Sequence, residues 1–249
     1  MKPICRVFIV LGCLLGGVAS PFTASAGLLA ASTRLIYQEG SREHSLMLAN
    51  TNDYPVIVQS WIDDGRGDAS RAQAPFVVIP PVFRMEPQAK QGVRIVYNQA
   101  PLAADRESVW WLNLYEIPPT ARANAGENRL LMSMNTQLKI FYRPRSLAPP
   151  TAENSIAQLR CLLTTAGTRQ AIRCHNPTPY HISFVRLTLA AGGQRQQAAQ
   201  QMDMMLYPFS DKTYPLTSGG PAHGDKVVAH WLNDDGAMQQ SDIVLVKAE

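Results

Sequence analysis

Two cysteines, Cys161 and Cys174, are the residues whose type and spacing most directly imply chemistry in this chain. Gly167-Thr168 between them suits a two-residue hairpin turn with glycine in the first central position. Counting outward from that turn sets Cys161 opposite Cys174 at a non-hydrogen-bonded pair, where Cα atoms approach to about 4.5 Å. The spacing therefore predicts a cross-strand disulfide, worth about 3 kcal/mol of stability. A redox or metal pair is disfavoured because CxxC spacing and further ligands are missing.

The other residue types capable of chemistry form no recognisable active site. The sequence has no GxSxG elbow, no Gly-rich phosphate loop and no HExxH, so we do not predict an enzyme. The histidine pairs lack a third ligand at metal spacing, and we expect surface or turn histidines, with no metal or cofactor, at His175, His181, His223 and His230. A methionine cluster could bind copper(I), but the adjoining Leu206 favours a core strand for Met202, Met204 and Met205.

Composition excludes two broad classes of protein. Hydrophobic residues make up 46% of the 249 residues and charged residues 17%, and this apolar fraction is too high for a disordered chain. The formal net charge of +4 is small, and no block of Lys and Arg supplies the concentrated basic footprint expected of a nucleic-acid-binding protein.

Residues 1–26 have the three-part pattern of a secretory signal peptide. Two basic residues come first, an uncharged apolar run follows over residues 7–18, and Ala24-Ser25-Ala26 supplies small residues at a cleavage site. The run is shorter than the roughly 20 apolar residues of a membrane-spanning helix. A lipoprotein with lipid on Cys13 is disfavoured because that cut would leave almost no apolar segment. We expect an exported protein in an oxidising compartment, where the disulfide would form.

Short strands make up the remaining chain. Turns rich in Gly, Pro, Asn and Asp separate them, and the first block comprises residues 33–37, 45–50, 56–62, 76–79 running on to 82–85, 93–97, 109–117 and 130–143. A proline-rich connector then leads to a second block with the disulfide hairpin and residues 180–189, 201–206, 226–232 and 242–246. This pattern is typical of immunoglobulin-like sandwiches. We expect an all-β protein with two such domains, residues 27–144 and 145–249.

The expected strand at residues 130–143 is long and has an unusual apolar row. Alternation sets Leu130, Met132, Met134, Leu138 and Ile140 on one face. An exposed edge strand is normally blunted by a charge or a proline, and neither occurs between Leu130 and Leu138. The sequence leaves two interpretations open: the row fills the domain's own core, or it is an exposed surface for a partner.

Many stretches, in the same order along the chain, resemble the periplasmic pilus chaperones of Gram-negative bacteria, the PapD-like family. The similarity extends over nearly all of the chain after residue 26. The matching stretches are residues 33–37, 59–64, 75–87, 94–97, 105–108, 111–113, 116–119, 138–144, 176–180 and 233–236.

The resemblance implies a boomerang of two immunoglobulin-like domains that works in the periplasm. Such a chaperone binds pilus (fimbrial) subunits that lack their last strand, lends its own G1 strand to complete them, and delivers them to an outer-membrane usher. The resemblance identifies neither the cognate subunits nor the organelle, and it leaves open whether the free protein caps its donor strand as a homodimer.

The resemblance also assigns the binding residues. Arg34 and Lys139 match the cations that anchor the subunit's C-terminal carboxylate, a role that suits a bidentate guanidinium and an ammonium. Leu130, Met132 and Met134 match the donor-strand side chains that fill the subunit groove, and methionine is the more adaptable filler. Lys139 falls on the opposite strand face from these three residues.

Three further residues, Glu107, Arg143 and Asp234, match an interdomain ionic network of the family. Asp235 is an alternative to Asp234 because the two acids are adjacent. The segment between residues 119 and 130 is short and has no cysteine, which resembles the short-loop branch of the family, although it is a few residues longer than expected. The cysteine hairpin is not a family requirement and is expected to stabilise the second domain locally.

A fimbrial subunit or adhesin is the alternative function, since such proteins are also exported and immunoglobulin-like. A subunit is expected to carry an N-terminal extension of alternating apolar residues and a C-terminal strand with a penultimate tyrosine. Residues 27–30 and 246–249 have neither pattern. The sequence therefore favours the chaperone over the subunit.

Overall fold

The computed structural model describes residues 27–66, 74–119, 132–167, 169–191, 194–217 and 224–246. The predicted signal peptide and Leu130 lie outside these residues. Apart from one 3-10 turn at Ile156–Gln158, every regular element described is a β-strand, which confirms the all-β fold class. Within the same residues there is no helix long and apolar enough to cross a membrane.

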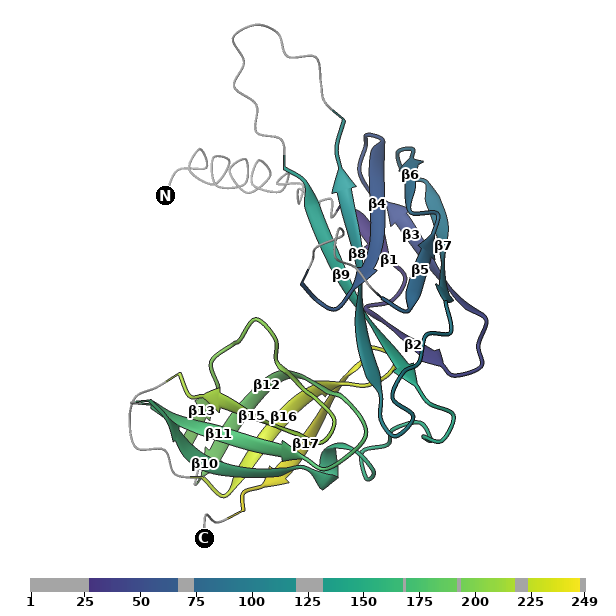
Figure 1. The fold of residues 1–249 in the computed structure, drawn as a ribbon. Helices are drawn as coiled ribbons and strands as arrows, with labels where there is room; N and C mark the ends of the chain where they lie inside the picture. Colours follow the sequence, from purple (N-terminus) through teal and green to yellow (C-terminus); the bar gives the residue numbers. More distant parts are fainter. Residues whose placement is uncertain are drawn as a thin grey trace, which may run out of the picture.

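The N-terminal body packs two sheets against each other (Figure 1). The first sheet contains, in spatial order, β1 (Leu28–Ala30), β3 (Glu43–Asn50), β7 (Lys90–Tyr97) and β5 (Phe76–Ile79). The second contains β2 (Arg34–Gln38), β9 (Met134–Arg143), β8 (Ser108–Ile117), β4 (Val56–Asp63) and β6 (Val82–Met85). Alternate residues of each strand point inward, as in β4, where Val56, Val58 and Ile62 are buried while Ile57 is exposed. The result is one hydrophobic core between the two sheets.

The stretch expected to run from residue 76 through residue 85 changes sheets in its middle. Pro80 and Pro81 separate β5, which pairs with β7, from β6, which pairs with β4. Proline cannot donate to a ladder. The carbonyl of Pro81 instead accepts from the Ser60 amide at 2.7 Å, which fixes the crossing strand to β4.

The C-terminal body is a second pair of sheets with its own core. One sheet contains β10 (Arg160–Ala166), β11 (Arg169–Asn176) and β15 (Ser210–Pro215). The other contains β13 (Gln194–Gln197), β12 (Ile182–Ala191), β16 (Lys226–Leu232) and β17 (Met238–Val244), with β14 (Met205–Leu206) paired to β12. The two cores share no residue, so each body has the immunoglobulin-like sandwich predicted from the strand pattern.

The disulfide hairpin has the predicted register. Cys161 lies opposite Cys174, and the pair is bonded with the Cα atoms 4.1 Å apart. Ala166 lies opposite Arg169 across the turn, where Gly167 has a φ of 62°, a left-handed conformation that glycine adopts without a steric cost. Both cysteines are fully buried in the second core, so this prediction is confirmed.

Other expectations for the second body were wrong in detail. Only Met205–Leu206 of the expected strand 201–206 is a strand, and Met202 is fully exposed while Met204 and Met205 are buried. The last strand ends at Val244 and begins earlier than expected. Strands β13 and β15 were missed because their sequences are mostly polar and lack a clear apolar alternation.

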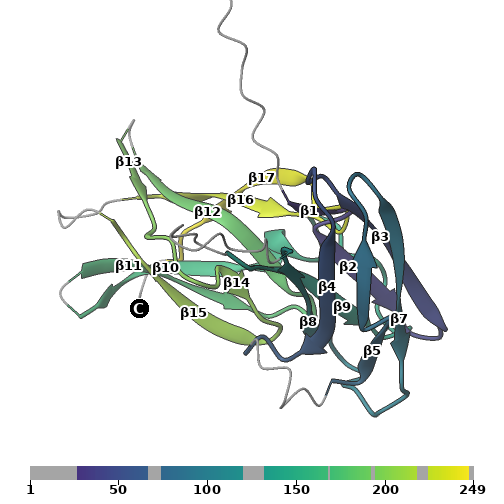
Figure 2. The same ribbon diagram turned by 90° about the horizontal axis from the view of Figure 1, so that it is seen from above.

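The two bodies meet at an angle, with β8 and β9 reaching down to the junction (Figure 1). Seen from above, β1–β9 lie mainly on one side of the view and β10–β17 mainly on the other, and the two sets overlap in the middle (Figure 2). The C-terminal end of β9 and the turn between β16 and β17 come together at this junction, where Arg143 contacts Asp234. The long strand of the first body therefore leads directly into the contact with the second.

Candidate functional site

Strand β9 is paired along only part of one side. Residues 134–142 pair with β8, from Glu116 opposite Met134 to Ser108 opposite Tyr142. Its other side pairs in parallel with β2, but only over residues 139–143. No other strand of the described chain pairs with that side of residues 134–138. This segment is therefore an open edge that presents unpaired backbone N–H and C=O groups.

The apolar row of β9 changes from buried to exposed within this open segment. Leu138 and Ile140 are buried in the first core, whereas Met132 and Met134 are 69% and 57% exposed. The row is therefore part of the core at its C-terminal end and exposed at its N-terminal end. Leu130 lies outside the described residues. The open backbone edge and the exposed thioether side chains belong to the same short stretch of chain.

A polar network holds the other face of this open segment in place. Asn113 of β8 is fully buried, and its Oδ1 accepts from the side-chain amides of Asn135 at 3.1 Å and Gln137 at 2.8 Å. Its own amide donates to Asp63 at 2.9 Å, and Asp63 also accepts from the Trp61 indole at 3.0 Å. No local sequence pattern indicates this network, although Asp63 and Asn113 both fall in stretches that carry the family resemblance.

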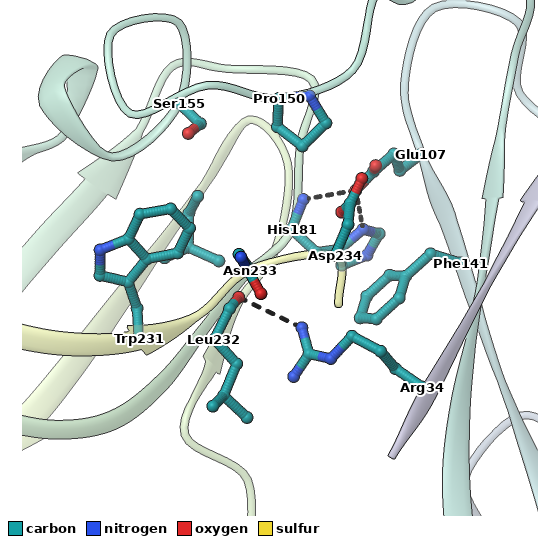
Figure 3. Close-up of a pocket in the computed structure, with 11 residues that line it drawn as sticks. Arg34, Glu107, Phe141, Pro150, Ser155, His181, Trp231, Leu232, Asn233 and Asp234 are labelled. Atoms are coloured by element: carbon teal, nitrogen blue, oxygen red, sulfur yellow. Dashed lines mark hydrogen bonds and ion pairs between the residues drawn. The ribbon is translucent and has the colours of Figure 1, made fainter. Parts of the chain in front are cut away.

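Two cations lie side by side next to the open edge. Arg34 of β2 is in register with Lys139 of β9, so the two side chains share the outer face of the sheet. The Arg34 guanidinium donates to the carbonyl of Leu232 at 3.2 Å and lies 5.6 Å from the centre of the Phe141 ring (Figure 3). Its buried Nε has no hydrogen-bond partner among the described residues. The Lys139 ammonium lies 3.5 Å from Asp203.

Burial makes this pair of cations receptive to an anion. Desolvation lowers the pKa of Arg34, and the charges of Asp234 and Glu107 only partly offset it. Desolvation also lowers the pKa of Lys139 despite the nearby Asp203, and the charge of Arg34 adds to that effect. A carboxylate bound between the two side chains would relieve both penalties, because an opposite charge stabilises the ionised forms.

A buried ionic network crosses the junction between the bodies. Arg143, at the end of β9, donates from Nε to Glu107 at 2.9 Å and makes a bidentate contact with Asp234 at 2.7 and 3.0 Å. Asp234 comes from the turn between β16 and β17, and Asp235 is exposed. The three residues assigned by resemblance are thus brought together, and Asp234 rather than Asp235 makes the contact.

His181 belongs to the same network, contrary to the expectation of a surface or turn histidine. Its side chain is 3% exposed, its backbone amide donates to Glu107 at 2.9 Å, and its Nδ1 lies 3.3 Å from the same carboxylate (Figure 3). Burial alone would raise the pKa of Glu107, but the contacts with His181 and Arg143 outweigh it and hold the pKa below its ordinary value. Glu107 is therefore an ionised, fully partnered carboxylate that ties both bodies to Arg143.

The junction is closely packed. The cavity drawn in Figure 3 encloses about 30 Å³ and is lined by Arg34, Phe141, His181 and Trp231 among others, which is room for about two water molecules. In the part of the chain that the structure describes, no three His, Cys, Asp or Glu side chains gather in a way that could hold a metal ion.

Comparison with known proteins gives one consistent result. The family model described as "Pili and flagellar-assembly chaperone, PapD N-terminal domain" matches residues 27–148, and "Pili assembly chaperone PapD, C-terminal domain" matches residues 154–243. The chain is 34% identical over 218 residues to the Bordetella pertussis chaperone protein FimB/FhaD, with 85% of each chain covered.

Solved structures give the same match. The crystal structure of the YadV chaperone, a protein of Escherichia coli, is similar with a TM-score of 0.74 and 30% identity over 88% of this chain and 100% of that one. The Salmonella enterica SafA pilin in complex with the SafB chaperone is similar with a TM-score of 0.71 and 27% identity, covering 90% and 98% of the two chains.

The junction network predicts a sharp difference between two adjacent aspartates. Asp234→Asn should lower the free energy of unfolding by about 1–2 kcal/mol, because it weakens the bidentate contact with the buried Arg143 side chain. The effect is no larger because the Asp234 side chain is 37% exposed and solvent screens its charge. Asp235→Asn removes the same charge from an exposed side chain and should change stability by less than about 0.5 kcal/mol. Denaturant unfolding measures both, and small-angle X-ray scattering should report a wider spread of interdomain angles for Asp234→Asn alone. Equal behaviour of the two variants would contradict the assigned network.

Proposed function

This chain belongs to the PapD-like family of pilus-assembly chaperones, and we propose that it holds fimbrial subunits by lending them the open edge of β9 and by binding their C-terminal carboxylate. The protein is a fimbrial chaperone and not an enzyme, and a fimbrial subunit or adhesin is not favoured because its relatives are chaperones. A relative in this family, SafB, has been solved in complex with the pilin SafA.

One observation carries this proposal: the unpaired edge of β9 at residues 134–138. An open edge accepts a further strand through main-chain hydrogen bonds, which depend little on the partner's sequence. A natural edge of this length is usually protected by a charge or a proline, and the described part of this segment has neither. The network centred on Asn113 supports the edge from β8, so the strand is ready to pair without first being ordered.

The exposed side chains of the same segment give the pairing its specificity. The strand expected from residue 130 begins at Met134 in the structure, and Met132 precedes it. In the proposed complex, Met134, Met132 and Leu130 would enter an apolar groove in the subunit. An unbranched thioether adapts to pockets of different shape. This property suits a chaperone that receives more than one kind of subunit.

The cation pair would hold the end of the subunit chain. Arg34 has a buried donor without a partner among the described residues, and Lys139 lies beside it on the neighbouring strand. A planar guanidinium and an ammonium together offer charge-assisted hydrogen bonds to both oxygens of a terminal carboxylate. Binding at this fixed point would set the register in which the subunit pairs with β9.

The ionic network of Glu107, Arg143 and Asp234 would keep the two bodies at the angle that the cleft requires.

We also propose residues 27–144 and 145–249 as the two domains, with residues 1–26 removed on export to the periplasm. There the chaperone would deliver its subunits to an outer-membrane usher. The same geometry allows the free protein to cap its open edge as a homodimer, since two open edges can pair with each other.

Loss of either cation should weaken subunit capture. Arg34→Met and Lys139→Met keep most of the side-chain bulk but remove the charge, and each should weaken binding at least tenfold because the carboxylate loses a charge-assisted contact. The measurement is recovery of the fimbrial subunit encoded beside this gene in pull-downs from periplasm. Arg94→Met is the matched control, since Arg94 is half exposed in the first body and forms an ion pair with Glu43 at 3.2 Å.

Wild-type capture that either cleft variant loses, with Arg94→Met unaffected, would support the anchor. If both cleft variants bind as well as wild type, the anchor assignment is wrong. A wild-type protein that captures no subunit would contradict the chaperone mechanism as a whole.

A charge placed on the exposed part of β9 should also prevent binding. Met134→Lys should leave the free energy of unfolding within about 0.5 kcal/mol of wild type, because the side chain is 57% exposed. It should weaken subunit binding at least tenfold, since an ammonium would have to enter an apolar groove. Met238→Lys makes the same change at a 58% exposed methionine on β17 and should bind normally. Equal binding by the two variants, measured by co-purification, would show that Met134 does not contact the subunit.

A further inference from the structure

The Lys139 ammonium already has a carboxylate partner from the other body. Asp203, which precedes β14, lies across the junction with its Oδ1 3.5 Å from the Lys139 Nζ. The two side chains are only 26% and 34% exposed, so the contact is partly shielded from water. The cation assigned to the subunit's carboxylate is therefore paired, in the free protein, with a group of the same chemistry.

Other contacts hold Asp203 independently of Lys139. Its Oδ1 accepts from the backbone amide of Met205 at 3.0 Å, and its Oδ2 lies 3.5 Å from the Lys212 ammonium. Lys212 is itself fixed by the carbonyls of Asp203 and Met205, at 2.6 and 3.0 Å. Asp203 thus has a stable position on its own body, with a second cation, whether or not Lys139 remains its partner.

We infer that Asp203 is an internal competitor of the subunit's C-terminal carboxylate for Lys139, and that it sets how readily the chaperone releases a bound subunit. The inference rests on the proposed function. A subunit carboxylate that reaches the cation pair must take Lys139 from Asp203, and afterwards it lies close to a second negative charge. Because Asp203 keeps Met205 and Lys212 when displaced, the exchange leaves no buried charge without a partner.

The two cations of the anchor differ in this respect. Arg34 has no carboxylate within ion-pair distance among the described residues and keeps an unpartnered Nε, so it can bind an incoming carboxylate first. Lys139 then changes partner from Asp203 to the subunit. The return of Lys139 from the subunit's carboxylate to Asp203 would assist release of the subunit, since Asp203 stays beside Lys139 while the subunit is bound.

Replacing Asp203 should make the complex longer-lived. A purified complex of the chaperone with the subunit encoded beside its gene is mixed with excess tagged wild-type chaperone, which captures the subunit as it dissociates. We expect Asp203→Asn to slow dissociation by about tenfold, because it removes both the competitor and the like charge. Asp242→Asn is the matched control: Asp242 on β17 forms an ion pair within the second body, with Lys226 of β16 at 2.6 Å, and the complex of this variant should dissociate at the wild-type rate.

Further variants test whether the effect passes through Lys139. Asp203→Glu keeps the charge and should dissociate at a rate close to wild type. In a Lys139→Met background, Asp203→Asn should have no further effect on the dissociation rate. In the free protein, carboxyl NMR should show the pKa of Asp203 rising on Lys139→Met, because burial already favours its neutral form and one stabilising charge is lost.

The outcomes separate this inference from the proposed function. If the subunit complex of the Asp203→Asn variant dissociates at the wild-type rate or faster, the inference is overturned while the chaperone function stands. A slowing that persists without Lys139 would also overturn it. Failure of the wild-type protein to form any complex would contradict the proposed function, and the inference would fall with it.

Discussion

Strand β9 is ten residues long and its parallel neighbour β2 only five, so half of one backbone edge of β9 has no partner within the described chain. This difference in length determines which part of β9 is paired on both sides and which part is open. Where β2 covers β9, the register brings Arg34 beside Lys139 and buries the apolar side chains of β9 in the core. Where β2 is absent, the backbone edge and two methionines are exposed. One strand therefore carries a buried segment, an open backbone edge and one of the two neighbouring cations.

Contacts across the junction between the bodies hold these segments of β9 against the second body. Arg143 at the end of β9 is held by Glu107 and Asp234, one from each body, so the strand is fixed at its far end against the second body. The contact of Lys139 with Asp203 crosses the same junction closer to the open edge. In the proposed mechanism, subunit binding and interdomain geometry would be coupled through this single strand, because Asp203 of the second body contacts Lys139, the proposed anchor on the first.

The features predicted correctly from the residues alone depend on contacts within a short stretch of sequence. The family resemblance supplied most of the site residues. The disulfide hairpin follows from a two-residue turn and strict alternation, and its register was correct. The open edge could not be deduced, because it depends on where β2 stops and on a parallel pairing between segments about a hundred residues apart. His181 was misjudged for the same reason, since its partner Glu107 is 74 positions earlier. Residues 201–206 were taken for a strand because methionines that pack from a loop give the same apolar signal as a strand.

Amide hydrogen exchange along β9 tests the central claim most directly. In the free protein, residues 139–143 should exchange slowly because both sides are paired, whereas the alternate amides of residues 134–138 that point away from β8 should exchange quickly. In the complex with a fimbrial subunit, those fast amides should become protected at least tenfold, as expected for a newly added strand. A stable complex in which they exchange as fast as in the free protein would contradict strand donation by β9.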